Sequence, residues 1–520
     1  MKAKTLMIQG TSSDAGKSLL VAALCRIMSD KGYKVAPFKS QNMALNSFVT
    51  EKGHEIGRAQ ALQAAAARIK PSVDMNPILL KPTDSQRAQV IVRGKVYKNL
   101  SAKEYHSEKL SLLKIVEESL KNLLNNFDMI IIEGAGSPAE INLKNEDIAN
   151  MRIAKMADAP VILVGDIDRG GVFASLIGTL ELLDLDERAR IRGLAINKFR
   201  GDVSLLRPGI DFLEAKTGVK VVGVIPYMQE LKIDSEDSLA LDKANFKTST
   251  DSMIDIAVIR LPHISNFTDI DIFMHEQGVN LRYVEPGSQI GETDLLIVPG
   301  TKNTVDDMRV LHETGMTEEI RRLRELGTPI IGICGGYQML GKEIRDNYGI
   351  ESSKSVIDGI GLLNCITSII PSKVTVQVEA VVCGGGAILG PVGGKTVTGY
   401  EIHMGVTKPL ENTFAAFRIK KRGNIKGDVN DGCVSSDGLV IGTYIHGIFD
   451  NGEFRKGLLD FLKARKGLEQ DSSEVEYDVY RQKGLDYLAK AVSDSLDMDY
   501  IFKIMGVSDH VGPGGLSIRS

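Results

Sequence analysis

A glycine-rich turn between an apolar strand and an apolar helix is the feature that most restricts the fold of this chain. The strand is Thr5–Gly10, the turn is GTSSDAGKS, and the helix begins LLVAALCRIM. Such a turn directs backbone N–H groups and the positive end of the helix at a phosphate. Five residues, one more than is usual for this motif, separate Gly10 from Gly16. The predicted phosphate-binding residues are Gly10, Thr11, Ser12, Ser13, Asp14, Ala15, Gly16, Lys17 and Ser18.

Further apolar strands follow, and several of them lead to a polar side chain. Lys34–Phe38 precedes Lys39, and Gly193–Lys198 carries Asn197. Strands that alternate with helices form a doubly wound parallel sheet, and the carboxyl ends of its strands line the ligand crevice. We expect Lys39 beside the phosphates, with a surface lysine as the alternative. Asn197 should lie at the same edge, where its amide can contact a nucleotide base.

Glu133 and Ser18 are the predicted magnesium ligands. Glu133 ends the apolar strand MIIIE, and a carboxylate in that place suits Mg²⁺ or orients a water molecule. A turn carboxylate that caps the next helix is the alternative interpretation. Asp166 and Asp168 are alternative metal or substrate contacts, and Arg169 can bind a carboxylate or phosphate.

The second half contains a cysteine on a predicted strand-to-helix turn, in the segment TPIIGICGGYQMLG over Thr328–Gly341. A short β-branched strand breaks at Cys334, and two glycines lead into a helix. A side chain on such a turn points out of the sheet at the positive end of the helix, which favours the thiolate, the form that attacks. A buried and inert structural cysteine is the alternative. We expect Cys334 to be a nucleophile.

A cysteine nucleophile needs a base, and His446 and His403 are the candidates. His446 follows an apolar strand, so it should lie at the end of the sheet, as Cys334 does. His403 lies inside an alternating β segment and is expected to pack or to face a substrate. Backbone amides near Gly300 and at Gly335 are expected to stabilise an oxyanion, and losing one such donor typically costs ~3 kcal/mol.

The chain therefore divides into two α/β units. Residues 1–228 form the predicted phosphate-binding unit, and the polar segment 229–252 is the predicted linker. Residues 253–455 form the unit with the nucleophile. Residues 456–520 are expected to be a helical tail in which no chemistry is evident.

The net charge and the cysteine content argue against several classes of partner and site. A net charge of −4 gives no reason to expect nucleic acid or an anionic membrane as a partner. The five cysteines are scattered without a CxxC pair, which argues against structural zinc or disulfides and indicates a reducing compartment. No signal-peptide pattern and no apolar run near the ~18 residues of a membrane span is present, so we expect a cytoplasmic protein.

Both halves resemble known families in the residues just described. GTSSDAGKS, the lysine in APFKS, and IIIEGAG resemble the dethiobiotin synthetase family of P-loop enzymes, whereas GICGGYQML and TYIHGIFD resemble class I glutamine amidotransferases. The two halves in this order are typical of the cobyrinic acid amidotransferases. The resemblance covers residues 1–455 and includes FKSQNMALNS, GRAQALQA, MNPILLKPT, GDIDRGGVFAS, RLPHISNFTD and GYEIHMG.

The resemblance implies two doubly wound, mostly parallel-sheet domains, the second flavodoxin-like, and ATP- and glutamine-dependent amidation. The implied substrate is a corrinoid, cobyrinic acid a,c-diamide, whose b, d, e and g carboxylates are amidated through acyl phosphates. It also implies that Lys17 and Lys39 stabilise the transferring phosphate, that Ser18 and Glu133 bind Mg²⁺, and that Asn197 contacts adenine.

One position departs from the amidotransferase pattern. Typical members carry a glutamate two residues after the histidine, and here that position is Ile448. The cobyrinic branch lacks this glutamate, so Cys334 and His446 are predicted to act as a dyad that releases ammonia from glutamine. The alternatives are a related a,c-diamide synthase, a regulatory P-loop ATPase with an inactive glutaminase-like module, and amidation of a cell-wall precursor.

Overall fold

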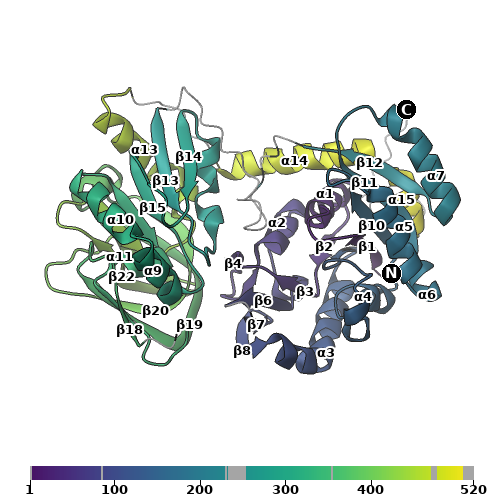
Figure 1. Ribbon diagram of the computed structural model, residues 1–520, viewed down its shortest axis with the longest axis horizontal. Helices are drawn as coiled ribbons and strands as arrows, with labels where there is room; N and C mark the ends of the chain where they lie inside the picture. Colours follow the sequence, from purple (N-terminus) through teal and green to yellow (C-terminus); the bar gives the residue numbers. More distant parts are fainter. Residues whose placement is uncertain are drawn as a thin grey trace.

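The computed structural model describes residues 3–83, 86–228, 231, 233, 253–352, 355–469 and 477–507 (Figure 1). Nearly all of the predicted linker 229–252 lies outside the described residues. The two predicted α/β units are both present, and helix α14 (Tyr477–Ser495) extends along the first of them. None of the described helices is long and apolar enough to cross a membrane.

The first unit is built on a parallel sheet with the strand order β12-β11-β10-β1-β9-β2. Its strands are apolar throughout, as in MIIIE and VILVGD, because both faces of the sheet are covered. The central strand β1 pairs in parallel with β9 on one side and β10 on the other, which opens a crevice at the carboxyl ends. The strands are β1 (Lys4–Gly10), β2 (Val35–Phe38), β9 (Met129–Glu133), β10 (Val161–Asp166), β11 (Ile191–Phe199) and β12 (Val221–Pro226).

Helices and two smaller sheets complete the first unit. The predicted helix after the glycine-rich turn is present as α1, and the predicted alanine-rich helix is present as α2. The helices are α1 (Lys17–Asp30), α2 (Arg58–Ala66), α3 (Ala102–Asn126), α4 (Met151–Ala157), α5 (Val172–Leu182), α6 (Leu185–Arg188) and α7 (Arg207–Thr217). The smaller sheets contain β3 (Gln41–Met43), β6 (Ile78–Pro82), β7 (Arg87–Val92) and β8 (Lys95–Ser101), and the hairpin of β4 (Ser47–Val49) and β5 (Glu55–Gly57).

The second unit has its own parallel sheet, in the order β14-β13-β15-β16-β24, with β23 antiparallel at one edge. This confirms the predicted pair of mostly parallel α/β domains. The elements of this layer are β13 (Ile254–Ile259), β14 (Val279–Val284), β15 (Leu295–Val298), α9 (Thr304–Glu313), α10 (Met316–Glu325), β16 (Ile330–Ile333), α11 (Gly335–Leu340), β23 (Cys433–Val434), β24 (Val440–Thr443) and α13 (Gly452–Arg465).

A further, mainly antiparallel sheet lies beside that layer. The sequence analysis identified an alternating β segment around His403, whereas β19 and β20 form a long antiparallel pair with a register shift between Ile369 and Val374. Residues of this sheet such as Ala380 and Phe417 share the core of the second unit. The elements are β17 (Glu343–Arg345), β18 (Val356–Asp358), β19 (Cys365–Val382), α12 (Gly386–Leu389), β20 (Thr396–Pro409), β21 (Phe417–Arg422) and β22 (Ile425–Asp431).

The C-terminal helices return to the first unit. Leu485, Leu488 and Val492 of α14 are buried in one core cluster with Leu20 and Leu24 of α1. The short helix α15 (Met498–Ile504) joins the same cluster. The sequence predicted helices here from amphipathic spacing, but the spacing does not identify the surface on which they pack, which belongs to the first unit.

Candidate active sites

Cys334 lies on a strained turn between β16 and α11. Its backbone has φ 53° and ψ −106°, a conformation that a residue with a side chain rarely adopts, and its amide donates to Thr443 O at 2.8 Å. Gly336 is required beside it, because a Cβ at that position would lie 1.9 Å from Val298 O. The turn therefore has the geometry of a nucleophile elbow, as the sequence predicted.

His446 is the candidate base that lies beside Cys334. A Cβ built on Gly300 would lie 3.3 Å from His446 Cε1 and 3.8 Å from Cys334 Cβ, so the predicted oxyanion position adjoins both candidate catalytic side chains. Gly335 begins α11, and the first amides of a helix have no acceptor within it. The candidate nucleophile, base and oxyanion donors are thus brought together at one end of the sheet.

Asp269 orients His446, and the sequence analysis did not identify it. His446 Nδ1 lies 2.6 Å from Asp269 Oδ2, and the Gly447 amide donates to Asp269 Oδ1 at 2.9 Å. The predicted dyad is therefore a Cys–His–Asp arrangement. Asp269 precedes His446 by 177 residues, so no local spacing signals the pair. Ile448 lies two residues beyond His446, where a glutamate was missing, and is fully buried.

The protonation of His446 follows from its neighbours. Burial alone would lower the pKa of His446, but the Asp269 carboxylate and the Cys334 side chain raise it to about 10. The imidazole therefore holds a second proton near neutral pH. An imidazolium beside the cysteine stabilises the attacking thiolate and can later donate its proton to a leaving group.

The first unit contacts this site directly. Tyr400 stacks on His446 with ring centroids 5.1 Å apart and an interplanar angle of 15°. Its hydroxyl donates to Ser47 O of β4 at 3.4 Å, and the Ser47 amide donates to Asn266 Oδ1 at 2.9 Å. Asn266 lies three residues before Asp269, so the hairpin of the first unit supports both the ring and the loop that position His446.

His403, the other candidate base, is held by packing. Its ring stacks on Tyr444 with centroids 3.8 Å apart, and its Nδ1–H donates to Gly405 O at 2.7 Å. It lines the same cavity as Cys334. This agrees with the expectation that His403 packs or faces a substrate.

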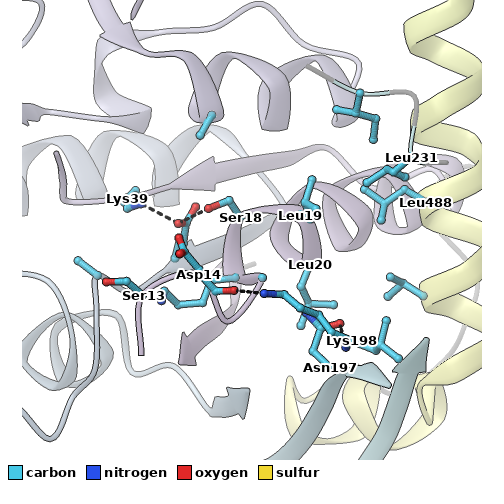
Figure 2. Close-up of a pocket in the computed structure, with 18 of the residues that line it drawn as sticks. Ser13, Asp14, Ser18, Leu19, Leu20, Lys39, Asn197, Lys198, Leu231 and Leu488 are labelled. Carbon is cyan, nitrogen blue, oxygen red and sulfur yellow. Dashed lines mark hydrogen bonds and ion pairs between the residues drawn. The ribbon is translucent and has the colours of Figure 1, made fainter. Parts of the chain in front are cut away.

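The predicted phosphate-binding residues surround the carboxyl end of β1. Lys17 Nζ donates to the carbonyls of Ser12 and Gly136, at 2.7 and 3.1 Å. Ser18 Oγ donates to Glu133 Oε1 at 2.7 Å, and Lys39 Nζ contacts the same oxygen at 2.7 Å (Figure 2). The residues predicted from three separate strands and turns therefore meet at the Glu133 carboxylate.

Glu133 is ionised in this arrangement. Burial would raise the pKa of its carboxyl, but the Lys39 ammonium and hydrogen bonds from Ser18 and Gln63 hold the pKa below its usual range. Gln63 Nε2, on α2, donates to Glu133 Oε2 at 2.6 Å. Sequence reasoning missed this glutamine, because an alanine-rich helix gave no sign that one of its polar side chains faces the crevice.

Asn197 lies against the phosphate-binding turn. Its side-chain amide donates to Ala15 O at 2.8 Å. Its side-chain carbonyl accepts the Lys198 amide at 2.9 Å, and Figure 2 shows Asn197 and Lys198 side by side at the cavity. The alternative metal contacts are engaged in ion pairs: Asp166 with Lys198 at 2.8 Å, Asp168 with Arg200 at 2.9 Å, and Arg169 with Asp14 at 2.9 Å. Glu133 is likewise paired with Lys39, so ion pairing does not distinguish between these candidate oxygen ligands.

A cavity of about 580 Å³ joins these groups, which is within the size range of small-molecule sites. One wall carries Lys17, Lys39 and Glu133. The opposite wall is apolar and includes Leu231 and, from α14, Leu488 (Figure 2). The tail in which the sequence showed no chemistry therefore lines the nucleotide cavity.

Comparison with known proteins agrees with both sites. Residues 6–240 match the model of the CobQ/CobB/MinD/ParA nucleotide binding domain, and residues 255–454 match the CobB/CobQ-like glutamine amidotransferase domain. The cobyric acid synthase of Thermoanaerobacter sp. (strain X514) is 52% identical over 501 residues, covering 96% of this chain and 98% of that protein. The chain belongs to the cobyric acid synthase family.

Other members of the family are similarly close. The cobyric acid synthase of Pelotomaculum thermopropionicum is 50% identical over 511 residues, covering 97% of each chain. That of Moorella thermoacetica is 51% identical over 506 residues, covering 97% of this chain and 98% of that protein. These matches include the C-terminal helices, since they extend over nearly the whole chain.

Proposed function

We propose that this protein amidates the b, d, e and g carboxylates of (adenosyl)cobyrinic acid a,c-diamide, using ATP and glutamine, to give (adenosyl)cobyric acid. The observation that carries the proposal is the presence, in one chain of the cobyric acid synthase family, of an assembled Cys334–His446–Asp269 site and a nucleotide cavity. The first site supplies ammonia, and the second activates the carboxylate that ammonia attacks.

The glutaminase half-reaction follows from the geometry at Cys334. The thiolate attacks the side-chain amide carbon of glutamine, and the amides of Gly300 and Gly335 stabilise the oxyanion. His446, held by Asp269, donates its proton to the departing nitrogen, so that ammonia leaves and a thioester remains. Water then hydrolyses the thioester with His446 as the base, which releases glutamate and restores the cysteine.

The synthetase half-reaction takes place in the nucleotide cavity. The turn over residues 10–18 binds the phosphates of ATP, and Lys17 and Lys39 stabilise charge on the phosphoryl group as it moves to a substrate carboxylate. The resulting acyl phosphate loses inorganic phosphate when ammonia attacks its carbonyl carbon. Asn197, beside Ala15, is placed to contact the adenine base.

Mg²⁺ fits this site through Glu133 and Ser18. Their side-chain oxygens lie 2.7 Å apart, and oxygen is the ligand type that Mg²⁺ prefers. In the described part of the chain, no cluster of three or more His, Cys, Asp or Glu could hold a metal by itself. This suits an ion held mainly by phosphate oxygens and water, which when bound neutralises charge on the transferred phosphoryl group.

The competing functions have less support. A regulatory ATPase with an inactive glutaminase-like module would have no need for the Asp269–His446 hydrogen bond beside a strained cysteine. An a,c-diamide synthase would share both sites, but the similar full-length relatives named above are cobyric acid synthases. Amidation of a cell-wall precursor has no observation in its favour.

Mass spectrometry of the corrinoid product tests the proposal. Purified protein is incubated with ATP, Mg²⁺, glutamine and adenosylcobyrinic acid a,c-diamide, and each carboxylate converted to a carboxamide lowers the product mass by a fixed amount. We expect all four conversions, and none when ATP is omitted. Conversion of cobyrinic acid but not of its a,c-diamide would instead assign the diamide synthase reaction, and ATP hydrolysis without amidation would favour the regulatory ATPase.

A further inference from the structure

The cavity next to Cys334 is lined by charged side chains that the mechanism above does not use. Lys302 and Glu351 line it from the second unit, together with Lys373, and Lys81 reaches it from the first unit. A nucleophile that acts on an amide does not need these charges. They indicate a ligand that carries charged groups in addition to the reacting amide.

Two of the three lysines already have a partner. Lys81 Nζ lies 2.9 Å from Glu55 Oε1 and donates to Ser47 Oγ at 2.8 Å. Lys373 pairs with the other oxygen of Glu55. Burial would raise the pKa of Glu55, but these two ammonium groups hold it far below its usual range, so Glu55 is an anion shared between them.

Lys302 differs from these two lysines. Within the described ranges, its ammonium group makes no hydrogen bond or ion pair, although its backbone amide is fixed by donation to His263 O at 3.0 Å. Burial lowers the pKa of Lys302, and the charges acting on it include Glu351 and Cys334. An incoming carboxylate would stabilise the ammonium form of this buried amine.

Glu351 lies beside Lys302 at the start of α9. Its Oε2 accepts the amides of Thr304 and Val305, at 2.7 and 3.2 Å. Burial raises the pKa of Glu351 to about 7, against the lowering effect of Lys302. The site thus offers one cation and one anion, with Glu351 held by the first amides of α9 and Lys302 two residues before that helix.

We propose that Lys302 binds the α-carboxylate of free glutamine and that Glu351 binds its α-ammonium group, while the side-chain amide lies at Cys334. The inference rests on the proposed glutaminase reaction and adds the basis of its specificity. Lys302 follows the oxyanion position Gly300 by only two residues, which span at most ~7 Å. That reach matches a substrate whose two charged groups are attached to a carbon that lies three carbon–carbon bonds from the reacting carbon.

Lys302 and Glu351 match the two opposite charges of a free amino acid. Lys81 and Lys373 already share the Glu55 carboxylate, so Lys302 and Glu351 are the charged pair of this cavity that an incoming ligand meets. The cavity that these side chains line has a volume of about 40 Å³.

Truncated substrates test the two contacts separately. The probes are glutamine, 4-aminobutanamide, which lacks the carboxylate, and 5-amino-5-oxopentanoate, which lacks the ammonium group. Ammonia release is measured with the full chain, ATP and corrinoid. For Lys302→Met we expect kcat/KM for glutamine to fall about 30-fold or more, because removing one member of a buried charge pair is costly. For 4-aminobutanamide we expect a change of less than about threefold.

Glu351→Gln should show the reverse selectivity, with a large loss for glutamine and little change for 5-amino-5-oxopentanoate. Lys302→Arg should restore part of the preference for the carboxylate. Lys342→Met, an exposed lysine outside the cavity, is the matched control and should leave all constants unchanged. Amidation with added ammonium salt should be normal in every variant, which shows that each one folds.

Two results would overturn the inference. One is an equal loss by Lys302→Met on glutamine and on 4-aminobutanamide, which would make Lys302 structural. The other is no loss on either substrate. Absence of ammonia release by the unaltered protein would instead contradict the proposed function, so the two failures are distinguishable.

Discussion

In the nucleotide site the reacting groups come from adjacent strands of one sheet, whereas in the cysteine site they come from three segments far apart in the chain. Lys39 and Glu133 follow or end neighbouring strands and contact each other at 2.7 Å. Asp269, Cys334 and His446 come from a short 3₁₀ helix, a strained turn and the segment after a strand. The first arrangement is fixed by the sheet itself, while the second depends on how separate loops pack.

The two sites also differ in their dependence on the rest of the chain. The cysteine site receives Ser47 from the first unit as a partner of Tyr400 and Asn266. The charged side chains that line the nucleotide cavity, by contrast, all come from the first unit. The C-terminal tail contributes the apolar face of α14 to the cavity wall. Substitutions in the cysteine site should therefore leave ammonia-dependent amidation unchanged, whereas substitutions in the nucleotide site should reduce it.

Replacing the nucleophile gives the largest expected difference between the sites. Cys334→Ser should lower glutamine-dependent amidation by roughly 10⁴-fold or more, since nucleophile removal has effects of this size in other enzymes. Amidation with ammonium salt should change by less than about twofold. Parallel rate measurements with the two nitrogen donors check this. A comparable loss with both donors would mean that Cys334 serves the synthetase reaction or the fold.

Asp269→Asn should have the second-largest effect. An asparagine amide leaves His446 without its counter-ion and favours the wrong tautomer of the imidazole. We expect glutamine-dependent kcat to fall by about 10²- to 10⁴-fold, by analogy with the serine protease triad. The pKa of His446, about 10 beside the carboxylate, should fall. A histidine NMR titration would detect that shift, and an unchanged pKa would show that Asp269 does not act on the imidazole.

Lys39→Met should reduce amidation with either nitrogen donor by about 10²- to 10³-fold, because it removes a positive charge from the transferring phosphoryl group. Ammonia release from glutamine, assayed alone, should be affected much less. Lys121→Met, an exposed lysine on α3, is the control. Retained ammonia-dependent activity in Lys39→Met would contradict the assigned role.

The pH dependence of glutamine use gives the smallest expected effect. Glu351 faces Lys302 and Asp346, and its pKa of about 7 means that it becomes neutral as the pH falls below that value. If it binds the α-ammonium group, kcat/KM for glutamine should fall about tenfold between neutral and acidic pH as a charged hydrogen bond is lost. The fall should be absent in Glu351→Gln, and an identical profile in both proteins would refute the contact.

The same contrast explains what the sequence could predict. The parallel sheet, the phosphate-binding turn and the meeting of Lys39, Ser18 and Glu133 at the strand ends were predicted from the sequence, and the structure has all of them. The turn that carries Cys334 could be predicted for the same reason, because its motif is contiguous in the sequence. Contiguous motifs of this kind fix their own geometry, because the backbone conformation is set within a few residues.

Asp269 and α14 could not be predicted in this way. Asp269 reaches His446 only through tertiary packing, and nothing in the local sequence distinguishes it from the neighbouring carboxylate Asp271. The helical spacing of α14 indicated an apolar face, but not that Leu488 would line the nucleotide cavity. The unpartnered ammonium of Lys302 likewise becomes visible only when distant side chains are seen around one cavity.

Isotope transfer tests the central claim, that two sites in one chain act in sequence on a corrinoid. The full chain is incubated with ATP, Mg²⁺, adenosylcobyrinic acid a,c-diamide and glutamine labelled with nitrogen-15 at the side-chain amide, and the corrinoid product is analysed by mass spectrometry. We predict the label in every newly formed amide, and in none when Cys334→Ser is used with unlabelled ammonium salt added. Glutamine hydrolysis without label in the corrinoid would contradict the account.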